Sequence, residues 1–179
     1  MIGAGSIVLY FEILQVSIVG YGKLGGIELG HGSDLDLVFI HNASLNGYTD
    51  GERALDNQTF FTRLGQKIIH FLTTNMPSGA LYEIDMRLRP SGNSGMLVTR
   101  LNSFEHYQAN DAWTWEHQAL VRARVTAGNP ALAHEFEQVR RVTLCRQRDP
   151  ATLAREVIDM RQKMREHLGS KKPASFDLK

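Results

Sequence analysis

Cysteine, net charge and long apolar runs are all scarce in this sequence. Its 179 residues include one cysteine, Cys145, which excludes an internal disulfide and fits a reducing compartment. The formal net charge of +1 provides no global basic field that would favour nucleic acid. No run of about 20 apolar residues is present, and the first residues lack the positive region of a secretory signal. These absences predict a soluble cytoplasmic domain that binds neither nucleic acid nor membrane.

The sequence contains enough apolar residues for a sizeable core. Hydrophobic residues make up 42% and charged residues 22%, which is typical of globular proteins. Apolar periodicity and turn residues predict an α+β order, in which strands with one helix among them are followed by helices after about residue 102. The predicted strands are Ile7–Phe11, Val16–Val19, Asp36–Ile40 and residues 81–88, with a brief one over Met96–Val98. The predicted helices are Glu52–Met76, Ser103–Ala127, a helix capped by Asn129 that ends near Cys145, and one capped by Asp149 that ends near Leu168.

Two aspartates, Asp34 and Asp36, stand two residues apart where an apolar run begins. On a strand, alternate residues share one face, so both carboxylates point the same way. Like charges repel unless a cation lies between them, and a hard divalent cation prefers carboxylate oxygens. The pattern predicts a Mg²⁺ site, and Mg²⁺ usually accompanies a phosphate.

A third carboxylate, Asp85, lies on the predicted strand over residues 81–88. Alternation places Asp85 on the same face as Arg87 and Arg89. If this strand lies beside Asp36, three carboxylates gather with two arginines alongside. Such a cluster suits two metal ions roughly 3.5–4 Å apart, and the guanidinium forks suit phosphate oxygens.

Both groups have a plainer structural alternative. The aspartate pair also fits a helix cap or a solvated turn. The two arginines also fit surface ion pairs with Glu83 and Glu28.

The segment Gly20–Gly25 matches the pattern G-x-G-x-x-G of dinucleotide-binding folds. That fold expects an acidic residue about 20 positions later, at the end of a strand. Here that place holds Ile40–Asn42, and the two aspartates come earlier, at the start of a strand. A dinucleotide-binding unit is therefore the less favoured interpretation.

A glycine turn, Asp-x-Asp on a strand and a third Asp on a neighbouring strand resemble the polymerase-β-like nucleotidyltransferase superfamily. Within it, the sequence is similar to the glutamine synthetase adenylyltransferase family, also called glutamate–ammonia-ligase adenylyltransferase. The match covers about residues 16–179. Four segments carry it in order: Gly20–Leu29, Gly32–Phe39, Tyr82–Gly92 and Ala112–Arg124.

The resemblance implies a small mixed sheet flanked by helices, with a catalytic core over residues 1–101 and a helical extension over 102–179. It implies that Mg²⁺, as two ions, is bound by Asp34, Asp36 and Asp85, and that ATP is the substrate. The residues expected to contact the nucleotide are Gly22, Lys23, Gly32, Ser33, Arg87 and Arg89. The sequence departs from the superfamily where a Gly-Ser pair usually precedes the first Asp, because Gly22-Lys23 is nearest that place. The resemblance does not extend to residues 1–15, and the chain is expected to be a fragment.

The resemblance also implies transfer of AMP from ATP to a tyrosine of glutamine synthetase, with the PII signalling protein as regulator of the full-length enzyme. The segments Leu24–Gly26 and Trp113–Gln118 are more similar to the C-terminal, adenylylating half of that enzyme than to its other half. Two alternatives remain open. One is the related domain that removes AMP by phosphorolysis, and the other is a nucleotide-binding regulatory module that transfers nothing.

Overall fold

The protein is described by a computed structural model over residues 15–77, 79–80 and 82–169. The strand predicted over Ile7–Phe11 lies outside the described residues. Most of the described strands precede residue 101 and most of the helices follow it, but an unpredicted strand forms over Arg124–Gly128.

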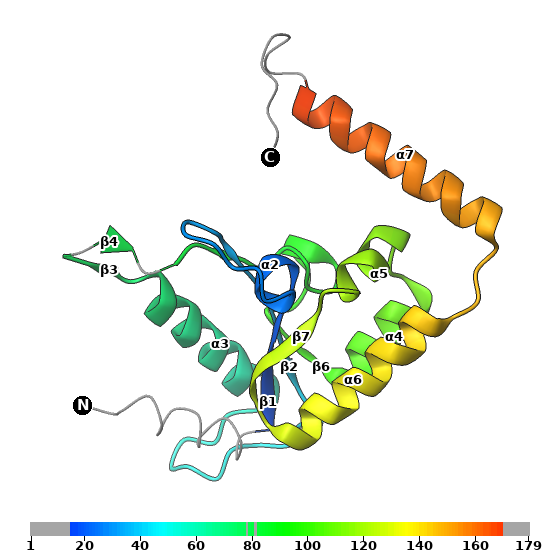
Figure 1. Cartoon of the computed structure of the whole chain (residues 1–179). Helices are drawn as coiled ribbons and strands as arrows, with labels where there is room; N and C mark the ends of the chain where they lie inside the picture. The colour runs from blue at the N-terminus through cyan, green and yellow to red at the C-terminus, as the bar shows by residue number, and fades with distance from the viewer. Residues whose placement is uncertain (1–14, 78, 81, 170–179) are drawn as a thin grey trace.

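A mixed sheet forms the centre of the molecule (Figure 1). Strands β1 (Val16–Gly20) and β2 (Leu35–His41) pair antiparallel, and β7 (Arg124–Gly128) pairs antiparallel with the other side of β1. Two short strands, β5 (Ile84–Asp85) and β6 (Val98–Arg100), each pair in parallel with β2. The predicted small mixed sheet is therefore confirmed.

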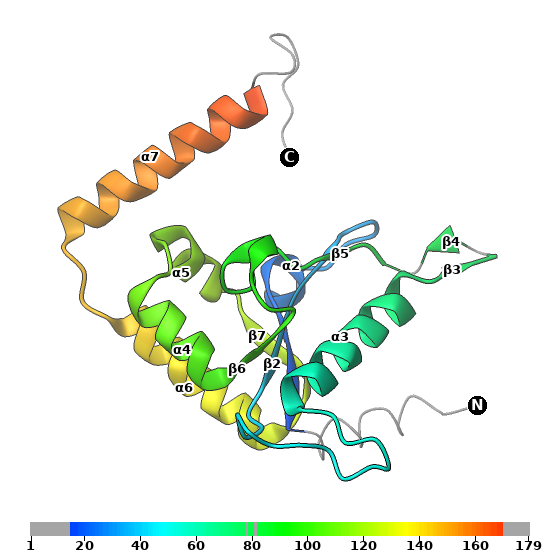
Figure 2. The same ribbon diagram turned by 180° about the vertical axis from the view of Figure 1, so that it is seen from behind.

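Helices cover both faces of this sheet (Figures 1 and 2). Helix α3 lies on one face, and α4 and α6 lie on the other, while the short helix α2 sits at the end of β1. Helix α7 leaves the body and contacts α5. The helix bounds are α2 Gly22–Gly25, α3 Asn57–Thr73, α4 Leu101–Asn110, α5 Thr114–Leu120, α6 Pro130–Cys145 and α7 Pro150–Gly169. A two-stranded ribbon, β3 (Asn75–Met76) with β4 (Gly79–Ala80), follows α3.

The two faces of β2 belong to separate apolar clusters, as the alternation predicted. Leu35 and Leu37 pack with Phe61 on the α3 side. Val38 and Ile40 pack with the helices on the opposite side. Asp36 has the parity of that second set, so its side chain lies at the end of an otherwise apolar face.

Local capping explains where three helices begin. Asp56 accepts a hydrogen bond from the Thr59 amide at 2.9 Å and starts α3. Asn129 caps α6 through the Leu132 amide at 3.0 Å, and Asp149 bonds the Thr152 amide at 2.8 Å beside the start of α7. The predicted caps at Asn129 and Asp149 are therefore confirmed. Helix α3 is shorter at both ends than predicted, because its cap lies at Asp56 and residues 75–76 enter the ribbon.

The single helix predicted over Ser103–Ala127 is wrong. This segment forms α4, α5 and then β7. Glu116 is the local cause of the first break, because its carboxylate accepts from the Trp113 amide at 2.8 Å and caps a new helix. Pairing with β1 then makes the last residues a strand. Neither tryptophan of this segment is buried in the core, since Trp113 is 70% and Trp115 39% exposed.

Replacing Glu116 should destabilise the fold. Its buried carboxylate also accepts from the Tyr107 hydroxyl at 2.9 Å, so Glu116→Ala leaves two donors without their acceptor. We expect a loss of about 2 kcal/mol in the free energy of unfolding. Urea denaturation measures this, with exposed Glu105→Ala on α4 as the matched control. Equal stabilities of the two variants would contradict the role of Glu116.

The glycine pattern does not belong to a dinucleotide-binding unit. That unit needs parallel strands joined by a crossover helix. Here β1 and β2 are antiparallel, and α2 between them has four residues.

None of the helices within residues 15–77, 79–80 and 82–169 combines the length and the apolar character that a membrane span requires.

Candidate active site

Three aspartates gather at one end of the sheet. Asp36 of β2 and Asp85 of β5 are directly paired across parallel strands, so they are immediate neighbours. Asp34 is exposed just before β2. Burial raises the pKa of Asp36, and the carboxylates of Asp85 and Asp34 raise it further. The structure therefore places the three predicted carboxylates close enough to repel one another.

Gly22 covers the Asp36 carboxylate. A Cβ atom at this position would lie 2.3 Å from Asp36 Oδ2, and the backbone has a left-handed φ of +49°. Glycine adopts this conformation readily and alone has no Cβ. The Tyr21 amide just before it donates to the Asp36 carbonyl oxygen at 2.9 Å. The glycine turn and β2 are thus held in direct contact.

Lys23 and Ser33 lie on the same side of the site. The Lys23 ammonium donates to the Ser33 hydroxyl at 3.4 Å, and the positive charge of Lys23 acts to lower the pKa of Asp36. Gly32 turns the preceding loop with φ of +69° and has open space around it. These three predicted nucleotide-binding residues lie beside the aspartates.

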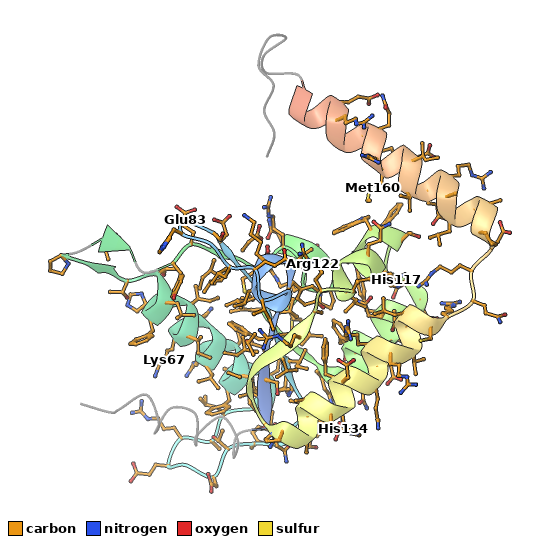
Figure 3. All side chains as sticks on the ribbon, viewed as in Figure 1. Lys67, Glu83, His117, Arg122, His134 and Met160 are labelled. Atoms are coloured by element: carbon orange, nitrogen blue, oxygen red, sulfur yellow. The ribbon has the colours of Figure 1, made fainter. Side chains whose placement is uncertain are left out.

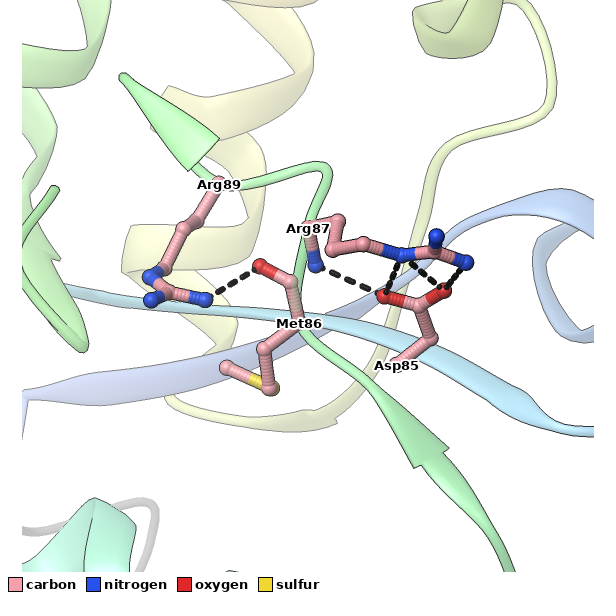
Figure 4. A network of polar contacts seen from close by, with 4 residues as sticks. All are labelled: Asp85, Met86, Arg87 and Arg89. Carbon is pink, nitrogen blue, oxygen red and sulfur yellow. Dashed lines mark hydrogen bonds and ion pairs between the residues drawn. The ribbon is translucent and has the colours of Figure 1, made fainter. Parts of the chain in front are cut away.

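Arg87 holds the Asp85 carboxylate (Figure 4). The Arg87 Nε donates to Oδ2 at 2.7 Å and to Oδ1 at 3.0 Å, and a terminal nitrogen completes the ion pair. These hydrogen bonds hold the pKa of Asp85 below its usual range. Arg87 also acts to lower the pKa of Asp36. The predicted proximity of Arg87 to the carboxylates is therefore observed.

The strand predicted over residues 81–88 is shorter than expected, and this changes the placement of Arg89. Only Ile84–Asp85 pairs with β2, and a turn follows. Arg89 does not lie on a strand face with Asp85. Its guanidinium donates to carbonyl oxygens of Met86 at 2.7 Å, Asn93 at 3.2 Å and Gly95 at 3.4 Å. Arg89 therefore stabilises the loop over residues 86–95 through these hydrogen bonds.

The carboxylates of Asp34, Asp36 and Asp85 are suitable ligands for a hard divalent cation, but they are not arranged as a preformed metal site. Among the described residues, no three carboxylate, imidazole or thiol groups form a ready-made metal cluster. Asp36 and Asp85 are nevertheless adjacent, and carboxylate oxygens are ligands that Mg²⁺ accepts. The mutual repulsion that raises the pKa of Asp36 is the effect a cation would relieve.

Two arginines that sequence reasoning did not single out support the glycine turn. Arg124 of β7 donates to the carbonyl oxygens of Gly25 and Leu24, each at 3.2 Å. Arg122 pairs with Glu28 and lies beside α2 in Figure 3. Arg124 is the first residue of β7 and Arg122 lies in the turn before it, and the helix predicted over Ser103–Ala127 gave no indication of either placement. Glu28 thus has an arginine partner other than the two considered from the sequence.

A cavity of about 660 Å³ opens beside the site. It is bounded by the loop before β2 and by the residues that precede β5. Its apolar lining includes Leu29 and Tyr82, and its polar lining includes His31, Ser33 and Glu83. Its lining residues Ser33 and Glu83 adjoin Asp34 and Asp85 in the chain, and the cavity is large enough for a small molecule or a side chain.

Comparisons with known proteins agree with the motifs. Residues 11–139 match the family described as glutamate-ammonia ligase adenylyltransferase. A bifunctional glutamine synthetase adenylyltransferase/adenylyl-removing enzyme of Hahella chejuensis is 58% identical over 93% of this chain and 18% of its own length. The protein of the same name from Pseudomonas syringae pv. tomato is 61% identical over 88% of this chain and 16% of its own length.

The chain spans less than a fifth of the length of these relatives. A crystal structure of a toxin-antitoxin with AMP-PNP aligns with 92% of this chain, but 14% identity and a TM-score of 0.34 support no conclusion. The sequence relatives and the family match extend over the glycine turn and all three aspartates. The chain therefore belongs to the glutamate-ammonia ligase adenylyltransferase family.

Proposed function

We propose that this chain transfers AMP from ATP to a tyrosine of glutamine synthetase, in the cytoplasm. The observation that carries the proposal is the pairing of Asp36 with Asp85 directly under Gly22. The two adjacent carboxylates would attract a divalent cation, and that cation would in turn bind the phosphates of a nucleotide. The names of the relatives support glutamine synthetase as the acceptor. The PII signalling protein belongs to the same proposal, as a regulator of the longer enzyme.

Asp34, Asp36 and Asp85 would hold Mg²⁺, as two ions. When bound, the metal neutralises phosphate charge and lowers the pKa of an attacking hydroxyl. Gly22 places no side chain over the Asp36 carboxylate, where a Cβ atom would lie 2.3 Å from Oδ2. Arg124 holds the glycine turn against β7, and Arg122 pairs with Glu28 just after this turn.

The cationic side chains around the carboxylates would orient the nucleotide. Lys23 lies at the Ser33 hydroxyl and provides a point charge for a phosphate oxygen. Arg87 has an exposed guanidinium at the edge of the site. As the phosphorus–oxygen bond to pyrophosphate breaks, such groups stabilise the developing negative charge. Arg89, with its three carbonyl partners, would act by holding the loop.

The test is transfer of label from α-³²P-ATP to purified glutamine synthetase with Mg²⁺. Labelled glutamine synthetase, absent without Mg²⁺, supports the proposal. ATP binding without transfer would support the regulatory module instead. Because the relatives are named for both activities, the same assay should be run in reverse, with AMP-modified glutamine synthetase and phosphate. Release of ADP without forward labelling would assign the AMP-removing reaction to this chain.

We expect the cavity beside the site to receive the acceptor protein. Tyr82 lines it and is 39% exposed. Tyr82→Ala should raise the KM for glutamine synthetase about 10-fold and leave the KM for ATP unchanged, because about 1–2 kcal/mol of aromatic contact is lost. Steady-state kinetics measure both constants. Tyr48→Ala, at an exposed tyrosine lining a different cavity, is the control. An equal effect of the two changes would contradict this placement.

A further inference from the structure

Arg87 and Asp85 differ in how firmly their side chains are held. The Asp85 side chain is 17% exposed, whereas the Arg87 side chain is 74% exposed. The guanidinium nevertheless occupies both carboxylate oxygens. Among the described residues, the guanidinium has this carboxylate as its hydrogen-bond partner. The rest of the Arg87 side chain is largely exposed to solvent.

The Asp85 carboxylate has a second anchor that does not depend on the guanidinium. The backbone amide of Arg87 donates to Asp85 Oδ1 at 2.8 Å. This bond stays in place whatever the Arg87 side chain does. The carboxylate therefore has one hydrogen bond that does not depend on the guanidinium.

Arg89, in the same loop, has a structural role and serves as a comparison for Arg87. Its guanidinium donates to three backbone carbonyl oxygens and is fixed by them. Among the described residues, the guanidinium of Arg87 is held by its ion pair with the Asp85 carboxylate alone. The Arg87 side of the ion pair is largely solvated, which lowers the contribution of the pair, and a divalent cation would replace the positive charge lost from Asp85.

The backbone amide and the guanidinium of Arg87 together donate to both oxygens of Asp85, so a divalent cation that binds these oxygens has to displace the guanidinium. We propose that Arg87 is a displaceable counter-cation: it neutralises Asp85 in the metal-free protein, yields the carboxylate to the metal, and then turns to the anionic nucleotide. This inference rests on the proposed function, because it takes Asp85 as a metal ligand. It gives Arg87 two opposite effects, competing with the metal and assisting the nucleotide.

Binding of Mn²⁺ to the complete 179-residue chain tests the first effect. Electron paramagnetic resonance measures the Mn²⁺ that remains free in solution. Arg87→Gln keeps the backbone amide but loses the guanidinium, so we expect Mn²⁺ to bind about 5-fold more tightly. Lys23→Gln removes the same charge near Asp36 without freeing a carboxylate, so its gain should be clearly smaller. Arg63→Gln, at an exposed position on α3, should leave Mn²⁺ affinity unchanged.

The second effect is tested with a non-transferable ATP analogue and Mn²⁺. Arg87→Gln should bind the analogue about 5-fold more weakly, although it binds the metal alone more tightly. Equal gains in Mn²⁺ affinity from the Arg87 and Lys23 changes, or no gain from Arg87→Gln, would overturn the inference while leaving the metal site intact. Wild-type protein whose Mn²⁺ binding is no stronger than that of Asp36→Asn would instead overturn the proposed metal site itself.

Discussion

Asp36→Asn is expected to reduce AMP transfer by about 1,000-fold, the scale of losing a main electrostatic contact in a transition state. Asparagine has the same shape but no charge, so the site loses the carboxylate that is paired with Asp85. The backbone bond from the Tyr21 amide to the carbonyl oxygen of residue 36 is unaffected. Label transfer from α-³²P-ATP to glutamine synthetase measures the loss.

The stability of this variant should not fall. Burial and two neighbouring carboxylates disfavour the charged form of Asp36, as its raised pKa shows. Removing the charge relieves both effects, so the thermal midpoint should stay equal or rise. Asp50→Asn, at an exposed loop position, is the matched control and should keep full activity. More than a tenth of wild-type transfer in Asp36→Asn would refute its role.

Gly22→Ala should have the second-largest effect on activity. The added Cβ would lie 2.3 Å from Asp36 Oδ2, so the carboxylate or the glycine turn must move. A displacement of about 1 Å at a reacting centre costs roughly 100-fold in rate. We expect a loss of that size in label transfer. The Kd for Mn²⁺ should also rise, because the displaced carboxylate is a proposed ligand.

Gly92→Ala separates this clash from backbone strain. Gly92 has a φ of +54°, close to the +49° of Gly22, but its Cβ would meet an ordinary contact at 3.6 Å. Both variants carry the same left-handed strain, of about 1 kcal/mol. We expect Gly92→Ala to lose stability and retain transfer. Equal losses of transfer in the two variants would attribute the Gly22 effect to strain alone.

Sequence periodicity predicted the part of the site that lies on β2. The alternation of Asp36 with Leu35 and Leu37 follows directly from the two-residue repeat of a strand. The structure confirms it, because the two leucines pack on the α3 side and Asp36 has the opposite parity. The caps at Asn129 and Asp149 were equally predictable, because each depends on a side chain and an amide three residues later.

The sequence alone could not predict the environment of Arg87 and Arg89. Both followed Asp85 with the spacing of a strand, but β2 pairs with only two residues there. The chain then turns, which brings one arginine onto Asp85 and the other onto loop carbonyls. Which partner each takes depends on where pairing stops, and that is a property of the neighbouring strand.

The amino-acid sequence by itself determined the family, through four motifs in order. It also determined the aspartate face and the capped helices, because these depend on residues close in the chain. Tertiary structure decided the rest. Strand β7 formed in a segment with a helical pattern because β1 offered it an edge. Asp85 met Asp36, and Arg124 met the glycine turn, only when distant segments packed together. The energy of pairing between strands far apart in the sequence outweighs the local preference for helix, and this pairing cannot be predicted from short sequence patterns.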